Sequence, residues 1–467
     1  MKKLSNLILF SLCFLTTSNA QENLGMRNDN YNPVNSQLLN PSNIVDAKPW
    51  LDINIVGASA YLRNNFAFYP NSTLLNFDQY DTDPSYKMSL DKIKAFGDFE
   101  IIGPSASIGI GRHSFSVFSN IRGVVNAKNI PGVLGKLKGS EGLTLADTGT
   151  YNINNARVKS MVWGEIGITY GKILIATNDN MLTGAISVKR LFGFQNTAIL
   201  VDDALVRVPT LESQILIQTN GKYSYTEPGF STGKGWVTNL GLTYKKMKED
   251  VTSYIPHSTR SGCEQINYKY KIGVSLLDIG YINFDNNSYY GDFDENTAVD
   301  DVNSLNDLNA ESQSNQAGSS YKAWLPAAAS LQVDYNLNDR IYFNGTIIQN
   351  FPTANTYGVE RANTLAVSAR YETNYLGVGI PLSLNNYVNP QIGLAIRIAN
   401  ITIGSDNFLP LFFKHDEIKA GDIYFSLKHT FFKNPNCKDR SGRNKKSRSV
   451  KSKLLQSKRK SLDCPAF

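Results

Sequence analysis

The C-terminal part of the chain repeats one pattern, in which apolar side chains alternate with small or polar ones over short stretches. The clearest stretches span residues 365–372, 376–384, 392–398, 401–404 and 423–431. Successive side chains of a β-strand point to opposite faces of the sheet. Period two therefore predicts strands with one apolar face and one small or polar face.

The second face separates two all-β classes. In a soluble sandwich the apolar face lies inside, and Lys, Glu and Thr usually occupy the face that meets water. Here the second face carries mostly Gly, Ala and Ser, as at Gly377, Gly379 and Ser383. Small residues suit the crowded inner wall of a closed barrel, and stretches of about ten residues match tilted membrane-spanning strands. We predict an all-β chain that forms a transmembrane antiparallel β-barrel of about 14 strands; a soluble sandwich or multi-domain surface protein is the alternative.

Connection lengths give an independent indication of a barrel. Membrane barrels have short periplasmic turns and longer external loops. Read backwards from the last stretch, long or medium connections (406–420, 385–390, 351–361 and 285–320) alternate with tight ones (399–400, 373–374 and 336–339). A soluble sandwich has no reason to follow this alternation.

The N-terminal half has the same signals in a less regular form. Further strands are expected at 51–55, 105–110, 114–117, 166–170, 185–191, 214–218, 236–244 and 272–284. Leu276 and Leu277 break the alternation within the last of these, which predicts a β-bulge. The segment before Trp50 is rich in Asn and Pro and has no periodicity.

The first twenty residues predict export. Lys2 and Lys3 precede an apolar stretch over 7–15, and Ser18 and Ala20 place small residues before a cut at Gln21. This is a cleavable signal peptide, because the apolar stretch is too short to span a bilayer as a helix. Together with a barrel, it predicts the outer membrane of a Gram-negative bacterium and contact with outer-membrane lipid.

A basic tail dominates the net charge of +7. Residues 433–467 contribute +10 and the signal peptide +2, which leaves −5 for the rest. Nucleic acid is not expected as a partner, because the export signal removes the chain from the cytosol. We predict a disordered periplasmic tail over 434–467 that contacts peptidoglycan or other envelope proteins, with a solvated extension as the alternative. Cys437 and Cys464 bracket the tail and could form a disulfide in an oxidising compartment; the alternative is two free thiols.

Residues with chemical function are sparse. The four histidines, His113, His257, His415 and His429, have no metal-ligand spacing, and no nucleophile or phosphate-loop motif accompanies them, so no enzyme and no cofactor are expected. Residues 292–296 begin like a calcium loop, but Thr297 and Asn303 replace its Gly and Glu, which favours a solvated acidic loop. Charges on the polar strand faces are expected inside the barrel, where they either pair in a packed lumen or line a substrate path: Asp278, Asp334, Arg370, Glu372, Arg397 and Lys428.

Several strand signatures resemble a family of uncharacterised outer-membrane barrels that is distantly similar to the long-chain fatty-acid transporters. They are Asn40-Pro41-Ser42, Met181 to Phe194, Gly273 to Gly280, Leu365 to Glu372 and Asp422 to Phe425, and the similarity covers about Gln21 to Lys433. The resemblance implies fourteen strands and an N-terminal plug inside the lumen. The basic tail and the acidic loop depart from the transporters.

With this resemblance, the expected organisation is a signal peptide at 1–20, a plug segment at 21–49, a barrel at 50–433 and the tail at 434–467. The expected function is a channel or transporter for small apolar or amphipathic compounds. The alternative is a non-conducting structural or secretion-complex subunit of the cell envelope.

Overall fold

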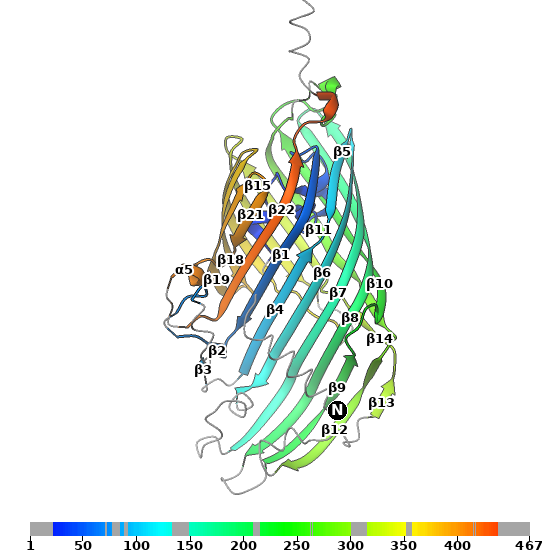
Figure 1. The fold of residues 1–467 in the computed structure, drawn as a ribbon, viewed down its shortest axis with the longest axis vertical. Helices are drawn as coiled ribbons and strands as arrows, with labels where there is room; N and C mark the ends of the chain where they lie inside the picture. The colour runs from blue at the N-terminus through cyan, green and yellow to red at the C-terminus, as the bar shows by residue number, and fades with distance from the viewer. Residues whose placement is uncertain are drawn as a thin grey trace, which may run out of the picture.

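One antiparallel sheet closes on itself to form a barrel in the computed structural model of the chain (Figure 1). The structure describes residues 22–70, 72–76, 85–87, 92–132, 149–208, 215–261, 263, 265–299, 315–351, 357–413, 415 and 417–437. The signal peptide and the tail beyond Cys437 lie outside the described residues. Closure is made by β1 (Leu51–Asn64) and β22 (Ala420–Phe431), whose register pairs Leu51 with Phe431.

The wall has 14 strand positions, as predicted. Nine are single strands: β1, β6 (His113–Pro131), β7 (Gly149–Thr177), β8 (Asn180–Val208), β16 (Ile341–Asn350), β17 (Thr364–Glu372), β18 (Leu376–Asn385), β21 (Ile401–Ser405) and β22. Interrupted strands fill the others: β4 (Lys92–Ile102) with β5 (Ser105–Ile110), β9 (Ile215–Thr226) with β10 (Gly233–Met247), β11 (Tyr268–Phe284) with β12 (Ser288–Val299), β13 (Asn315–Gly318) with β14 (Tyr321–Trp324) and β15 (Ala328–Asn336), and β19 (Asn389–Ile392) with β20 (Leu394–Ile398). The short pair β2 (Ala67–Phe68) and β3 (Ser85–Tyr86) forms a separate sheet.

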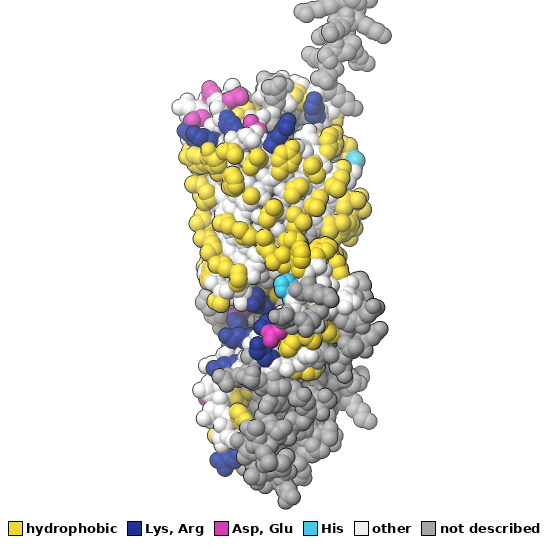
Figure 2. All heavy atoms as spheres, turned by 90° about the vertical axis from the view of Figure 1, so that its left-hand side faces the viewer, with side chains coloured by type: hydrophobic (Ala, Val, Ile, Leu, Met, Phe, Trp, Pro, Cys, Tyr) yellow, Lys and Arg dark blue, Asp and Glu magenta, His cyan; other side chains and the backbone are white. Residues whose placement is uncertain are grey.

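The predicted alternation is confirmed, with the apolar face outside. Along β17 the exposed positions include Leu365, Val367 and Tyr371, whereas Arg370 and Glu372 are buried. Figure 2 shows the apolar side chains gathered into a band around the barrel, with charged groups beyond its upper edge. This inside-out pattern is that of a membrane barrel, not of a soluble sandwich.

The outward face of β10 shows the height of the band. Trp236, Leu240, Leu242 and Tyr244 lie outward between two lysines, Lys234 and Lys246. From Trp236 to Tyr244 a strand that rises about 3.4 Å per residue and is tilted by about 40° covers roughly 21 Å. Aromatic rings at both edges of an apolar band about 25 Å tall are typical of outer-membrane barrels.

The two ends of the barrel differ. At one end, the turn end, strands are joined by short connections at 111–112, 178–179, 337–340, 373–375 and 399–400, which include the predicted tight turns. At the other, the extended end, β7 and β8 continue far beyond the band; each has 29 residues, whereas about ten suffice to cross a membrane (Figure 1). Within the described residues, no helix combines the length and the apolar character needed to cross a membrane.

Two strand predictions have different outcomes. The expected loop over 285–320 is partly wrong, because β12, β13 and β14 occupy much of it as wall strands. A strand outside the membrane needs no apolar face, so the period-two signal is missing there. The expected bulge in β11 is confirmed: Leu240 pairs with Leu276 but Thr238 with Ile279, so Leu277 and Asp278 face a single residue. Asp278 has a φ of 55°, and its side chain lies inside the barrel.

Candidate functional site

Residues 22–49 lie along the inner face of the wall and are nearly all buried. This N-terminal segment contains α2 (Leu24–Arg27), α3 (Pro33–Ser36) and η2 (Pro41–Ile44). The Gln37 amide donates to Ser116 on β6 at 2.9 Å, and the Asn40 amide donates to Gln332 on β15 at 2.9 Å. Because its polar groups find partners on several wall strands, the segment needs no regular periodicity of its own.

The upper charge cluster joins the start of this segment to the wall on the side of the extended end. It consists of Glu22, Arg27, Glu100, Arg122, Glu165, Lys189, Asp278 and Arg361. Asp278 is its centre: it lies 2.8 Å from Arg122, 2.8 Å from Lys189 and 3.6 Å from Arg361. Burial raises the pKa of Glu22, but the guanidinium groups of Arg361 and Arg27 outweigh this and hold the pKa below its ordinary value. The glutamate therefore stays charged.

The lower charge cluster lies nearer the turn end. It contains Asp29, Asp52, Lys271, Asp334, Arg370, Glu372, Arg397 and Lys428. Asp29 of the segment accepts from Arg397 at 2.6 Å, and the Asn30 amide donates to Glu372 at 2.8 Å. Segment and wall are thus held by ion pairs at two levels, and a third pair, Lys245 with Asp46 at 3.0 Å, lies below them.

The structure places each charge that the alternation put inside the barrel in one of these clusters. Asp278 belongs to the upper cluster; the lower cluster contains the others, namely Asp334, Arg370, Glu372, Arg397 and Lys428. All are at most 3% exposed and each has an ion-pair partner. They pair with one another or with the N-terminal segment, as charges withdrawn from water require.

Sequence reasoning missed other members of the clusters. Glu165 and Lys189 stand at polar positions of strands whose apolar positions had been recognised, so the same parity rule could have found them. Glu22, Arg27 and Asp29 lie in a segment without periodicity, and no sequence signal places their side chains.

An apolar cluster lies inside the barrel beyond the upper charge cluster, toward the extended end. Its buried members are Val124, Met161, Trp163, Leu191, Val237, Ile282, Phe284, Tyr321, Ala323, Leu325 and Val359, with Phe96, Tyr290 and Tyr357 packed against it. Trp163 joins the two layers, because its indole donates to Glu165 at 2.7 Å and Arg122 stacks over its ring. The interior thus changes from apolar to charged along the axis.

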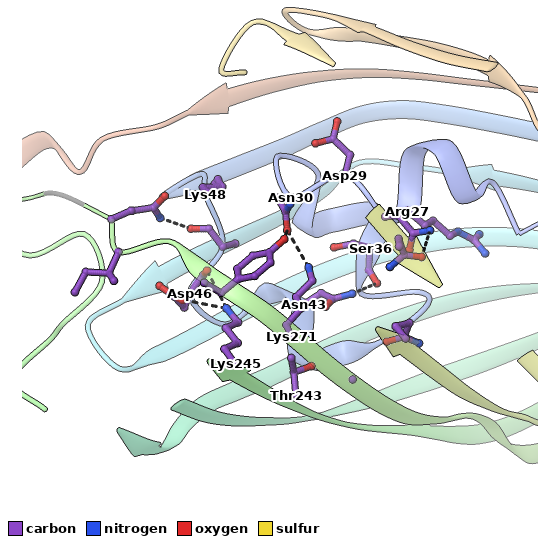
Figure 3. A pocket seen from close by; sticks show the side chains of 18 residues that line it. Arg27, Asp29, Asn30, Ser36, Asn43, Asp46, Lys48, Thr243, Lys245 and Lys271 are labelled. Atoms are coloured by element: carbon purple, nitrogen blue, oxygen red, sulfur yellow. Dashed lines mark hydrogen bonds and ion pairs between the residues drawn. The ribbon is translucent and has the colours of Figure 1, made fainter. Parts of the chain in front are cut away.

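A polar cavity remains between the segment and the wall near the turn end (Figure 3). Lys48, Asp46 and Asn30 of the segment face Lys245 and Lys271 of the wall across it. It has room for roughly three water molecules. The interior is otherwise filled at this level, so passage along the axis requires the segment to move.

The predicted cysteine pair is wrong. Cys437 forms a disulfide with Cys263 in the connection between β10 and β11, at a Cα–Cα distance of 5.7 Å. A sulfur atom takes one disulfide partner, so Cys437 is not available to Cys464, which lies outside the described residues. Sequence spacing could not show this, because Cys263 and Cys437 are separated by 174 residues.

The histidines and the acidic stretch fall at separate places. His113 and His429 lie outward at the turn end, where His429 packs edge-on against Phe431. His257 lies in the β10–β11 connection, and His415 in the connection before β22. Asp292 belongs to strand β12, paired with β9, rather than to a loop. Among the described residues, no group of three His, Cys, Asp or Glu side chains could hold a metal ion.

A model of a family of unknown function, DUF5723, matches residues 41–406 of the chain. The chain belongs to this family. The match runs from η2 to the end of β21 and so covers most of the wall. The sequence resemblance to an uncharacterised family of barrels is confirmed, and no curated protein sequence matches.

Solved barrels resemble the DUF5723 chain at low identity. The toluene transporter TbuX of Ralstonia pickettii is 9% identical, with 86% of this chain and 94% of TbuX covered and a TM-score of 0.43. The toluene transporter TodX of Pseudomonas putida is 9% identical, with 83% and 90% covered and a TM-score of 0.39. A FadL homologue of Pseudomonas aeruginosa is 11% identical, with 90% and 99% covered and a TM-score of 0.33. At these values the likeness carries no conclusion about function.

Proposed function

We propose that this protein is a gated channel in the outer membrane of a Gram-negative bacterium, with the N-terminal segment as its plug. The observation that carries the proposal is the attachment of the segment, which contacts the wall through side chains at several levels and contributes no strand to the barrel. Ion pairs and side-chain hydrogen bonds can be exchanged for water without breaking the wall. A closed channel therefore requires only that the segment be displaced.

The apolar cluster indicates the class of solute. A compound that enters from the extended end meets the rings of Trp163, Phe284 and Tyr321 before it reaches the charged groups. Such a surface favours small apolar or amphipathic compounds over sugars or inorganic ions. The charged layer below then suits the polar end of an amphipathic molecule.

Deletion of residues 22–41 tests the channel. Proteoliposomes that contain wild type or the deletion variant are loaded with a short-chain alkyl sulfonate, whose charge keeps it from crossing the bilayer unaided. We expect faster efflux from the deletion variant, whereas a deletion of residues 442–467 leaves efflux at the wild-type rate. Heat-modifiable migration on a gel checks that both barrels are folded. Equal efflux from all three would refute the plug.

The filled interior favours a second candidate, a non-conducting structural or secretion-complex subunit. Both charge clusters lie within a wall that leaves only the small polar cavity between segment and wall near the turn end. A subunit of this kind co-purifies with other envelope proteins at fixed stoichiometry and shows no efflux even without residues 22–41.

A further inference from the structure

One connection at the turn end does not fit the pattern of short turns. Strands β10 and β11 are joined by residues 248–267, whereas the neighbouring turn at 178–179 has two residues. This β10–β11 loop contains η5 (Thr259–Ser261) and folds across the barrel mouth instead of projecting from it. Val251 is fully buried and Tyr254 is 3% exposed, although both lie in a connection.

The loop rests on two neighbouring turns. The backbone N–H of Val251 donates to the carbonyl of Asn178, and the N–H of Asn178 donates to the Thr252 hydroxyl at 2.9 Å. Arg112 in the next turn donates to the Thr252 carbonyl at 3.0 Å. These contacts fix the first half of the loop against the rim of the wall.

From the rim the loop reaches the N-terminal segment where the segment leaves the lumen. Val251 and Tyr254 pack in one cluster with Ile44 and Val45 of the segment. The Tyr254 hydroxyl donates to Asp46 at 2.9 Å, and the Gln265 amide donates to the Ala47 carbonyl at 2.6 Å. The segment cannot leave through the turn end while these contacts persist.

The Cys263–Cys437 disulfide fastens the far side of the loop. It joins the loop to η7 (Pro435–Cys437), which follows β22, and the Asn434 amide donates to the His257 carbonyl at 3.2 Å (Figure 1). Only a few residues separate each cysteine from its strand, since β11 begins at Tyr268 and β22 ends at Phe431. The bond therefore closes a short span across the mouth and fixes both of its ends to the wall.

We propose that the β10–β11 loop is a cap on the turn end, that the disulfide is its clasp, and that opening the clasp frees the N-terminal segment. The inference rests on the plug proposed above and adds a control point to it. A dithiol reductant opens the clasp: the disulfide takes up two electrons and two protons and becomes the thiols of Cys263 and Cys437, while the dithiol becomes a disulfide. The cap then depends on its noncovalent contacts alone.

Hydrogen exchange measured by mass spectrometry on the full chain in lipid nanodiscs tests the cap. In the double variant Cys263→Ser/Cys437→Ser, we expect the amides of residues 33–45 and 249–261 to exchange about 30-fold faster than in wild type. This is the equilibrium factor for a disulfide that contributes about 2 kcal/mol. The amides of β16 to β18 keep the wild-type rate. The variant Cys464→Ser serves as the matched control and exchanges as wild type does.

A second arm covers failure of the double variant to fold. Folded wild type is reduced with dithiothreitol and alkylated, and the same exchange rates are expected as for the double variant. Unchanged exchange over residues 33–45 in either arm would overturn the proposal, even if the loop itself exchanged faster. Because exchange is measured without any solute, a failure here is distinct from a failure of the channel in the efflux assay.

Discussion

Replacement of Asp278 by Asn tests whether the upper charge cluster holds the lumen together. The change keeps the shape of the side chain but removes the charge that faces Arg122, Lys189 and Arg361. Asp278 is 2% exposed, so water cannot replace the lost charge. Removal of one partner from a buried ion pair costs about 3–5 kcal/mol. We therefore expect the free energy of unfolding to fall by about that amount.

A surface pair supplies the control. Asp202 accepts from Arg157 at 2.6 Å, but its side chain is 49% exposed, so Asp202→Asn should cost less than about 1 kcal/mol. Urea unfolding of both variants in lipid vesicles, followed by tryptophan fluorescence, gives the two values. If Asp278→Asn lowered the free energy of unfolding no more than Asp202→Asn, the cluster would not stabilise the lumen as argued.

Three further outcomes are expected. The lowered pKa of Glu22 means that its docking contribution is present above its ordinary pKa of 4.5 and is lost as pH falls below it, so hydrogen exchange of residues 22–30 should rise between about pH 4.5 and 3; exchange that is independent of pH would contradict this. An epitope at Asn303 should be accessible on intact cells and one after Gly442 should not, and the opposite labelling would refute the assigned orientation. Deletion of residues 442–467 should weaken retention on purified peptidoglycan at low salt, because each basic side chain near an anionic surface contributes on the order of 1 kcal/mol; unchanged retention would show that the tail is no tether.

The barrel could be predicted from the sequence because lipid imposes a strict rule on each crossing strand. Every second side chain must be apolar, so parity alone placed Leu365 and Val367 outside and Arg370 and Glu372 inside. The same rule does not apply outside the membrane. Residues 288–299 therefore carried no period-two signal, although they form a strand.

The contacts of the interior were less predictable. Parity puts Asp278 in the lumen, but its three cations come from β6, β8 and the connection before β17, and only the closed wall brings them together. The N-terminal segment is irregular, and its partners are distant in sequence: Asp29 and Arg397 are separated by 368 residues. The disulfide partner of Cys437 was hidden for the same reason.

Closure of the barrel by β1 and β22 bears on the order in which the molecule is assembled. Asp52 and Thr430, which face each other across this seam, are separated by 378 residues, so the seam cannot form until the end of the wall has been synthesised. Until then the lumen is open along one side. Residues 22–49 can enter sideways, and Lys428 and Ser426 of β22 then close over Tyr31 and Asn35 as the last strand arrives. The segment does not have to thread lengthwise through a finished pore.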